Sequence, residues 1–542
     1  MGYVVEMHNF VVYMSKAHFL WVDDEIDLLK PYILFLAEKG YKTMCAGNGH
    51  DAIDICRTNK FDIVFIDEHM PGLSGLETLV ELKKDSPDMP IVMITKSEDE
   101  GIMNQAIGRN ISDYLIKPVN PNQVLLTIKK ILEKKILVND VVISNYSHEY
   151  LNLYDVITNC NSLSDWKNVY KKLVRRELEL EQGDETLKGM IEAQKDEANN
   201  YFAKFVRKNY KVWLDNSLSD YDQMVLSNNL FEKTVFPIID RGKKLYFILI
   251  DNFRLDQWEV AKDVVCEHFE LEEDMYLSIL PTATPYSRNS IFSGLLPIEI
   301  SRKFPDLWIN ESESEGKNES EKQFIESLLL RTGRNDSFSY HKINTKGDAE
   351  NLIARFNEID KKSLNVMVFN FIDMLSHSGT DSKIIRELAP DDAAYRSLTK
   401  TWLMYSPFKS LLKKIAESGS KIILTSDHGS IRVKKGVKVI GDSETNNNLR
   451  YKLGKSLAYD PKSVFEIIHP INYGLPAPNI STRYIFAQNR DFFLYPNSYN
   501  HFLNIFENSF QHGGISMEEM MIPLVTLCPK KNKIIYADNN RK

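Results

Sequence analysis

The sequence has little cysteine and no long apolar run. Its cysteines are scattered and none belongs to a CxxC pair: Cys45, Cys56, Cys160, Cys266 and Cys528. An odd, widely spaced set disfavours a disulfide framework and favours a reducing compartment, so we expect a cytoplasmic location. Because no run approaches the roughly 18 apolar residues of a membrane-spanning helix, we expect no membrane insertion.

The sequence also lacks an excess of basic charge. Its 542 residues include 67 Lys and Arg against 75 Asp and Glu, which gives a net charge of −8. Proteins that bind nucleic acid through bulk charge are usually basic, so any nucleic-acid contact here must be local. Hydrophobic residues make up 43% and charged residues 26%, which excludes disordered and collagen-like chains. At roughly 100–200 residues a domain, the length predicts about three to five domains.

The N-terminus lacks the basic segment that opens a signal peptide. Glu6 and His8 interrupt its apolar residues, so we do not expect a secretory signal. Met14 directly precedes Ser15-Lys16 and a strong strand pattern. We therefore hypothesise that translation starts at Met14, which N-terminal mass mapping of the native protein would test.

Residues 15–136 are predicted to form a first α/β domain. Short apolar runs alternate there with amphipathic stretches such as Ile26–Lys39 and Gly75–Lys84. The runs are Phe19–Val22, Lys42–Ala46, Asp62–Ile66, Ile91–Ile94 and Tyr114–Ile116. Five strands alternating with five helices predict parallel βαβ units in a doubly wound, flavodoxin-like sheet. The functional residues of such sheets gather at the carboxyl ends of the strands.

Residues 137–236 lack proline and strand-like runs. Charged and apolar residues alternate there at helical spacing, and the predicted amphipathic helices are Trp166–Leu180, Glu185–Lys208 and Leu218–Lys233. Their apolar positions do not keep a heptad, so we predict a helical connecting domain and not a long coiled coil.

Residues 237–530 are predicted to form a larger α/β domain, and residues 531–542 a polar tail. The predicted strands of this domain are Lys244–Ile250, Met275–Leu280, Asn365–Ile372, Lys421–Ser426 and Met521–Leu527.

Two polar segments of this domain, Glu311–Glu321 and Asp442–Lys455, are expected to be surface loops. The second contains Arg450, Lys452 and Lys455. We expect these three side chains to be in solvent, with contact to a substrate as the alternative.

Acidic residues follow the first and third predicted strands of the first domain. Asp23 and Asp24 come after the first and Asp67 after the third, so all three lie at the same sheet edge. Their oxygens suit Mg²⁺, and a carboxylate beside Mg²⁺ can attack a phosphoryl group. The fourth and fifth strands end near Thr95 and Lys117, whose side chains can bind new phosphate oxygens. Acids at strand ends can also be solvated turn residues, but matching groups on four strands disfavour this.

These residues, in this order, resemble the receiver domain of two-component response regulators over residues 17–135. The resemblance implies a sensor histidine kinase as partner and Asp67 as phosphoacceptor. It also implies that Mg²⁺ is held by Asp23, Asp24 and Asp67, that the phosphate is read by Thr95 and Lys117, and that Tyr114 is the aromatic switch residue.

The second α/β domain offers metal-ligand residues after its predicted strands. They are Asp251, Asp373 with His377 four residues on, Asp427-His428 and His512. Imidazole with carboxylate is a ligand set for Zn²⁺ or Mn²⁺. Three Asp and three His suffice for two metals, which about 3.5–4 Å apart clamp the oxygens of a phosphoryl displacement. Thr282 and Thr284 lie close by in the sequence, and metal coordination would activate such a hydroxyl as a nucleophile.

This order of residues resembles the alkaline phosphatase superfamily, specifically its PglZ branch, over about residues 240–530. The resemblance implies one metal on Asp373, His377 and His512, and another on Asp251, Asp427 and His428, with zinc favoured over manganese. It also implies Thr284 as nucleophile and metal-bound oxygen. Thr282 is the competing candidate; Thr284 is favoured because it opens the following helix, whose N-terminus attracts an anion. Arg288 and Asn289, one turn on, are candidates for holding the substrate phosphate.

A receiver, a helical segment and a PglZ-type domain together resemble the PorX family of Bacteroidota response regulators. The resemblance implies control of type IX secretion and gliding, a phosphodiesterase acting on nucleotides or oligonucleotides, and a phosphorylation-dependent homodimer. A secretion-system or transcription partner stays open. The alternatives are a phosphomonoesterase and a catalytically silent scaffold. A DNA-binding regulator is disfavoured by the acidic balance and by the lack of a basic recognition helix.

Overall fold

The computed structural model describes residues 17–87, 89–96, 111–128, 130–132, 152–181, 185–215, 224–309, 319–381, 387–442 and 445–530. These residues form two compact units, one within Met1–Glu149 and the other within Tyr150–Lys542. Met14, the tail at 531–542 and most of the predicted loop at 311–321 lie outside the described residues. No helix in the described part of the chain is both long and apolar enough to cross a bilayer.

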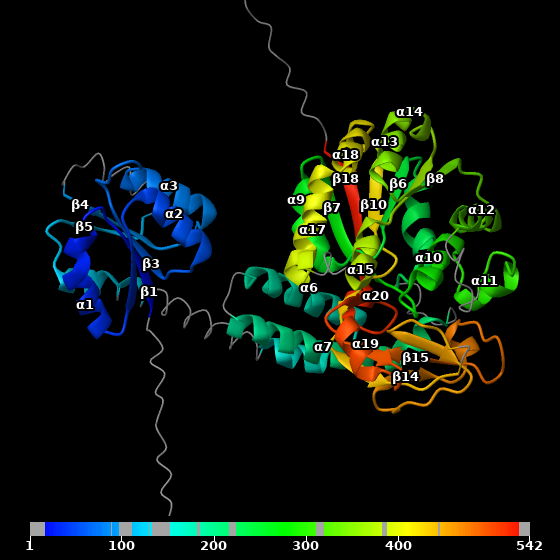
Figure 1. Cartoon of the computed structure of the whole chain (residues 1–542). Coiled ribbons are helices and arrows are strands. Elements are labelled where there is room, and N and C mark those ends of the chain that lie inside the picture. The colour runs from blue at the N-terminus through cyan, green and yellow to red at the C-terminus, as the bar shows by residue number, and fades with distance from the viewer. Residues whose placement is uncertain are drawn as a thin grey trace, which may run out of the picture. The chain divides into compact units, whose positions relative to one another are not determined.

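The first unit is a parallel five-stranded sheet in the order β2-β1-β3-β4-β5 (Figure 1). Its strands are β1 (His18–Val22), β2 (Lys42–Ala46), β3 (Ile63–Asp67), β4 (Ile91–Thr95) and β5 (Asp113–Ile116). Its helices are α1 (Lys30–Glu38), after the 3₁₀ turn η1 (Ile26–Leu29), α2 (Gly49–Thr58), α3 (Gly75–Asp85) and a helix at 121–128. Strands β3 and β4 are buried throughout, because side chains pack on both faces of the sheet. The predicted doubly wound fold is confirmed.

The second unit is built around a mixed six-stranded sheet in the order β7-β18-β10-β6-β9-β8. Its strands are β6 (Leu245–Ile250), β7 (Phe269–Leu277), β8 (Phe338–Ile343), β9 (Leu364–Phe369), β10 (Lys421–Thr425) and β18 (Met521–Pro529). Strands β8, β9, β6 and β10 run parallel, whereas β18 runs antiparallel to both β10 and β7. Along β6 the side chains alternate between two separate cores, one on each face.

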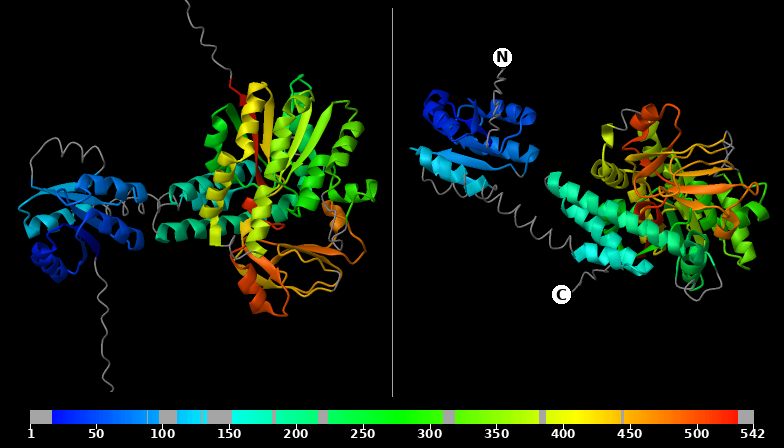
Figure 2. Two further views of the ribbon diagram at one scale, coloured as in Figure 1. Left: turned by 45° about the horizontal axis from the view of Figure 1, so that its top comes forward. Right: turned by 90° about the horizontal axis from the view of Figure 1, so that it is seen from below.

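Helices cover both faces of this sheet, as Figures 1 and 2 show. One face packs against α9 (Leu255–Cys266), α13 (Lys346–Ala354), α14 (Phe356–Ile359), α17 (Asp392–Tyr405) and α18 (Pro407–Glu417). The other packs against α8 (Phe236–Ile239), α10 (Thr284–Ser293), α11 (Pro297–Lys303) and α12 (Glu321–Arg331). Helix α15 (Phe371–Asp381) follows β9 directly.

A smaller group of strands lies between β10 and β18 in the sequence, and His512 directly follows its last strand. Its strands are β11 (Ile431–Arg432), β12 (Lys435–Lys438), β13 (Tyr451–Gly454), β14 (Val464–Ile467), β15 (Arg483–Ala487), β16 (Asp491–Leu494) and β17 (Phe510–Gln511). They pair as β11-β17, β12-β16 and β13-β15-β14. The short elements beside them are η5 (Pro470–Tyr473), α19 (Tyr499–Phe506) and α20 (Met517–Met520).

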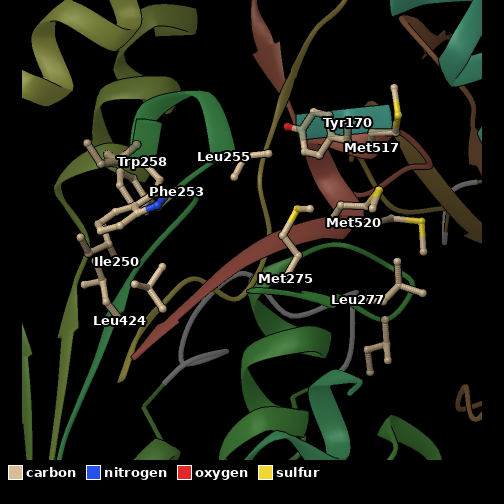
Figure 3. Close-up of a cluster of buried hydrophobic side chains, with 14 of the residues drawn as sticks. Tyr170, Ile250, Phe253, Leu255, Trp258, Met275, Leu277, Leu424, Met517 and Met520 are labelled. Carbon is tan, nitrogen blue, oxygen red and sulfur yellow. The ribbon is translucent and has the colours of Figure 1, made fainter. Parts of the chain in front are cut away.

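The two helices α6 (Leu163–Glu179) and α7 (Glu185–Trp213) lie side by side and share the core of this second unit. Figure 3 shows Tyr170 of α6 among the buried side chains around Met517 and Met520. Serine and aspartate at the start of α6, Ser162 and Asp165, form a capping box that fixes where the helix begins. The first two predicted helices are therefore confirmed.

The predicted helix Leu218–Lys233 is wrong. Its described part contains the 3₁₀ turn η3 (Ser227–Asn229) and a π-helical turn, η4 (Phe231–Val235). Leu226 forms a parallel bridge to Leu277 at the end of β7, so pairing with the sheet overrides the amphipathic helical pattern. The predicted strand Asn365–Ile372 also ends early, at Phe369, because Phe371 already opens α15.

Candidate phosphoacceptor site and candidate metal centres

The structure brings Asp23, Asp24 and Asp67 together at one edge of the first sheet. One carboxylate oxygen from each lies within 4.8 Å of the others. The ammonium of Lys117 lies 2.9 Å from Asp23 Oδ2 and 3.0 Å from Asp67 Oδ2. Thr95 ends β4 and is buried. The predicted acidic site, with its lysine and its hydroxyl, is thus assembled in one place.

Asp67 has the features expected of a cation ligand. Burial raises its pKa, although Lys117 acts in the opposite direction. Its Oδ1 atom is buried and has no hydrogen-bond partner among the described residues. Three carboxylates balanced by one lysine leave room for the charge of Mg²⁺, so the residues fit this ion. Tyr114 lies half-buried on β5.

In the second unit, the first predicted set of metal ligands comes from α15 and from the loop after β17. Ligand atoms of Asp373, His377 and His512 lie within 4.8 Å of one another. Asp373 Oδ2 is 3.3 Å from His377 Nε2, and Asp373 Oδ1 is 3.9 Å from His512 Nε2. The Asp and His of α15 meet because residues four apart share one helix face. Asp373 therefore lies in the first turn of a helix, and not directly behind a strand as predicted.

His512 is oriented to act as a ligand. Its Nδ1 lies 3.3 Å from the carbonyl oxygen of Thr282, which can only accept a hydrogen bond. Nδ1 therefore carries the hydrogen, and the lone pair of Nε2 faces Asp373. Burial, helped by nearby His428, lowers the pKa of His512 to about 3 and keeps the ring neutral, which is the form that binds zinc.

The second predicted set follows two neighbouring parallel strands. Asp251 comes after β6 and Asp427 and His428 come after β10, and their ligand atoms also lie within 4.8 Å of one another. All three are buried. The guanidinium of Arg288 contacts both carboxylates: its Nε donates to Asp427 Oδ2 at 2.9 Å, and its Nη2 forms an ion pair with Asp251.

The charges around Arg288 support metal binding at this set. Burial raises the pKa of Asp251, against the effect of Arg288. Burial acts the same way on Asp427, but there Arg288 outweighs it and lowers the pKa. One guanidinium offsets one carboxylate, and Asp251 Oδ1 is left buried without a hydrogen-bond partner among the described residues. A divalent cation would balance the second carboxylate, so the residues fit a metal.

The two sets adjoin, and Thr284 lies beside them. The rings of His428 and His512 stack with centroids 4.3 Å apart. Thr284 is buried as the first residue of α10, and its Oγ1 lies 3.0 Å from His428 Nε2. By contrast, the hydroxyl of Thr282 donates to Gly514 O at 2.9 Å and accepts from Gly513 N at 3.1 Å. The hydroxyl of Thr282 therefore holds the loop that carries His512.

Asn289, the other candidate phosphate ligand, has its amide turned back into its own helix. It donates to Pro285 O at 2.9 Å. Arg288 is enclosed by carboxylates, because its Nη1 also donates to Glu321 Oε1 at 3.3 Å. Direct contact of Arg288 or Asn289 with a substrate phosphate stays a prediction.

Several functional neighbours were missed by the sequence analysis. Glu321 was predicted to be a surface residue, but it is buried against Arg288, Tyr340 and Lys342. Arg450 and Lys452 were also expected in solvent, but both are fully buried near or on β13. The predictions for Glu321 and Arg450 were wrong because a charged partner distant in the sequence covers each of them.

Asn252 is a further missed residue, and it supports the first metal set. It has a left-handed backbone with φ of 60°. Its amide donates to Asp373 Oδ1 at 3.3 Å and to Ser376 Oγ at 3.1 Å. The sequence did contain a signal for this residue, the Asp-Asn pair at the end of a buried strand. Asparagine tolerates a left-handed backbone, so the pair could have predicted a tight turn beside the predicted metal ligand Asp251.

The loop that carries His512 is held from beneath by Glu519. Gly514 N donates to Glu519 Oε1 at 2.9 Å, and Arg450 Nε donates to the same atom at 3.0 Å. One residue away, Glu518 accepts from Asn199 Nδ2 of α7 at 2.9 Å. The backbone N–H of Met517 donates to Asn199 Oδ1 at 2.8 Å. Helix α7 is thus bonded directly to the segment behind the candidate metal site.

Three family models match consecutive parts of the chain. Residues 19–129 match the response regulator receiver domain. Residues 136–214 match the PorX response regulator linker domain. Residues 230–527, more than half of the chain, match the BREX system PglZ alkaline phosphatase-like domain.

Known proteins match shorter parts. The probable transcriptional regulator ycf27 of Cyanidium caldarium is 35% identical over 121 residues, covering 22% of this chain and 47% of that protein. The probable transcriptional regulatory protein TcrX of Mycobacterium tuberculosis is 28% identical over 144 residues, covering 24% of this chain and 61% of that protein. The chain spans about half the length of the curated relatives it matches.

Among solved structures, a receiver domain protein from Clostridium thermocellum is 29% identical. The match covers 22% of this chain and 98% of the Clostridium thermocellum chain, with a TM-score of 0.22. The chemotaxis protein CheY4 of Vibrio cholerae is 26% identical and covers 21% of this chain and 98% of that one, with a TM-score of 0.21.

The family matches agree with the order of the sites along the chain. The acidic Asp23, Asp24 and Asp67 lie within the receiver match, and both histidine-containing sets lie within the alkaline phosphatase-like match. The receiver match and the acidic group of Asp23, Asp24 and Asp67 together indicate a Mg²⁺ site. The buried Asp251, Asp427 and His428 indicate a metal-dependent hydrolase. The chain belongs to the PglZ alkaline phosphatase-like family and, with its receiver and linker domains, it is a PorX-type response regulator.

Proposed function

We propose that the second unit is a two-metal phosphodiesterase that acts on nucleotides or oligonucleotides under the control of Asp67 phosphorylation. One observation carries the proposal: two sets of three Asp and His ligands adjoin through the stacked rings of His428 and His512, with the hydroxyl of Thr284 beside them. Zinc is the preferred metal and manganese the alternative, because both accept these ligands.

In this proposal, Asp373, His377 and His512 hold one metal, and the other is held by Asp251, Asp427 and His428, with Thr284 also a ligand. Bound zinc supplies positive charge that stabilises a deprotonated hydroxyl and the oxygens of the phosphoryl group. The Thr284 oxygen displaces one alcohol from phosphorus, and water later displaces threonine. The N-terminus of α10 favours the anion at this position, because the positive end of the helix dipole lies at Thr284, the first residue of the helix.

The first test compares bis-p-nitrophenyl phosphate with p-nitrophenyl phosphate, with the zinc content measured in parallel. We expect diester turnover that a chelator abolishes. Thr284→Val should lose at least about a thousandfold in kcat, because it removes the nucleophile at nearly constant volume. Thr284→Ser is the matched control, since it keeps a hydroxyl and should keep measurable turnover. Turnover of the monoester alone would indicate a phosphatase. A zinc-loaded protein that turns over neither ester would favour a silent scaffold.

The regulatory part of the proposal is that a sensor histidine kinase phosphorylates Asp67 and that phosphorylation produces a homodimer in the cytoplasm. Acetyl phosphate with Mg²⁺ replaces the kinase in vitro. Light scattering should show a doubled mass for the wild type and an unchanged mass for Asp67→Asn. An unchanged mass of the phosphorylated wild type would remove the dimer from the proposal.

The cellular part of the proposal is control of type IX secretion and gliding, through a secretion-system or transcription partner. Chromosomal Thr284→Val and Asp67→Asn variants of a gliding host separate the two activities. If secretion depends on hydrolysis, both variants lose it. If only Asp67→Asn loses it, the protein signals through contacts and not through turnover.

A further inference from the structure

A cavity of about 400 Å³ adjoins the first metal set. His377 and His512 form part of its wall, and other walls come from β13, the segment after β16, and α19. Its volume lies within the roughly 300–1,000 Å³ of typical ligand pockets. The walls opposite the two histidines include Lys452, Tyr495, Phe502 and Phe506.

Lys452 brings a buried positive charge to this cavity. Its side chain is only 1% exposed. Its ammonium donates to Asn446 O at 2.9 Å and lies 4.7 Å from the centre of the Tyr495 ring. Within the described ranges, no carboxylate lies within ion-pair distance of it. An ammonium has three N–H donors, so donors are left over for a ligand.

The buried charge of Lys452 costs stability, because no carboxylate among the described residues balances it. A buried cation without a carboxylate partner is destabilising, and burial indeed lowers the pKa of Lys452 to about 8. Arg450, two residues earlier, shows the contrast, because its guanidinium is fully paired with Glu519. A methionine of similar length would pack at the position of Lys452 at less cost. Beyond its hydrogen bond to Asn446, the ammonium can balance an anion that enters the cavity.

The cavity also offers flat apolar surfaces. Phe502 and Phe506 stack along α19 with ring centroids 6.2 Å apart, and Phe502 is partly exposed at 38%. Tyr495 lies beneath the ammonium of Lys452. Asn447 and Asn448 line the same space, and side-chain amides can form hydrogen bonds with the edge of a base. Aromatic rings of this kind stack on nucleic-acid bases whatever their sequence.

We propose that this cavity binds the part of an oligonucleotide next to the scissile phosphate, and that Lys452 binds a second phosphate there. The base of the same nucleotide lies against the aromatic wall. The inference rests on the proposed phosphodiesterase function and narrows its substrates to those with a second phosphate one nucleoside away from the cleaved bond.

The test compares two dinucleotides that differ in one group, ApA and its 5′-phosphorylated form pApA. We expect wild-type kcat/KM to be at least about tenfold higher for pApA, which is the size of one charge-assisted hydrogen bond. Lys452→Met should reduce this ratio to near one, mainly through the KM of pApA. The matched control is Lys455→Met, which removes an exposed lysine three residues along and should keep the ratio.

A second measurement does not need turnover. Calorimetry on chelator-treated protein compares adenosine 5′-monophosphate with adenosine. The monophosphate should bind at least about tenfold more tightly to the wild type and lose this advantage in Lys452→Met.

The possible failures are distinguishable. If the wild type hydrolyses bis-p-nitrophenyl phosphate but its kcat/KM for pApA is no higher than for ApA, the subsite is refuted and the phosphodiesterase stands. If no diester is hydrolysed but the monophosphate binds through Lys452, the proposed function fails and the cavity is an anion site of a different kind. Equal binding of the monophosphate and adenosine to the wild type refutes the subsite even if Lys452→Met does not fold.

Discussion

Arg450 and Glu519 form an ion pair whose side chains are both 0% exposed. The guanidinium of Arg450 donates to both oxygens of Glu519, at 3.0 Å from Nε and 2.5 Å from Nη2. Its third nitrogen donates to the carbonyl of Asp491. Because Glu519 also holds Gly514, two residues from His512, we predict that Arg450→Met weakens both the fold and the first metal set.

The expected loss in the free energy of unfolding is about 3–5 kcal/mol, the usual cost of leaving one member of a buried pair without its partner. Glu519 keeps two other donors, Gly514 N at 2.9 Å and Ser516 Oγ at 2.7 Å. These place the expected loss toward the lower end of that range. Adding Glu519→Gln removes the stranded charge and keeps an acceptor for Gly514. The double variant should therefore recover about 1–3 kcal/mol relative to Arg450→Met alone.

The assay is guanidinium unfolding of the full chain, followed by tryptophan fluorescence. Five of the six tryptophans lie in the second unit, at positions 166, 213, 258, 308 and 402, so the signal mainly reports that unit. Zinc content measured on the same samples tests the effect on His512. A loss below about 1 kcal/mol for Arg450→Met, or a double variant less stable than the single one, would refute the reasoning.

Three further predictions concern separate parts of the chain. Asp67→Asn should take up no phosphate from acetyl phosphate, whereas the wild type gains one phosphate by intact-mass spectrometry; a labelled variant would place the acceptor elsewhere. The preference for pApA over ApA should hold below pH 8 and disappear as the pH rises through about 8, because burial lowers the pKa of Lys452 to that value and the charge exists only below it; a preference unchanged to pH 10 would exclude Lys452 as its source. Gly429→Ala should lower zinc content and turnover together, since its new Cβ would lie 2.1 Å from Glu518 O and the backbone next to His428 must shift; normal zinc content would show that the site tolerates this shift.

The position of both sites could be predicted from the sequence because parallel strands share a direction. Asp67 is the last residue of a buried strand, and Asp251 and Asp427 follow two others. The carboxyl ends of parallel strands meet at one edge of a sheet. Five apolar runs were enough to predict the strands of the first unit. These strands are short and almost entirely apolar, which is typical of a parallel sheet that is covered by helices on both faces.

The partners of buried charges could not be predicted in this way. Glu321 stands at the end of a Ser/Glu-rich run, and only the fold brings it to Arg288, 33 residues away in the chain. Arg450 pairs with Glu519 across 69 residues. Local composition describes both as surface residues, because the cost of burying a charge is offset by a partner that no local window contains.

The hydrogen bonds that join Asn199 to Met517 and Glu518 determine where the chain can be truncated and where one of its domains can be exchanged. Tyr170, Met517 and Met520 belong to one core, so helices α6 and α7 form part of the wall of the hydrolase. A truncated enzyme that begins at residue 230 would expose this apolar wall to water, and we expect it to aggregate. A truncated enzyme that begins near residue 150 keeps the wall covered. Exchange of the receiver for another sensor module should therefore be tolerated ahead of residue 150, whereas a linker from a distant relative would need matching changes in the hydrolase.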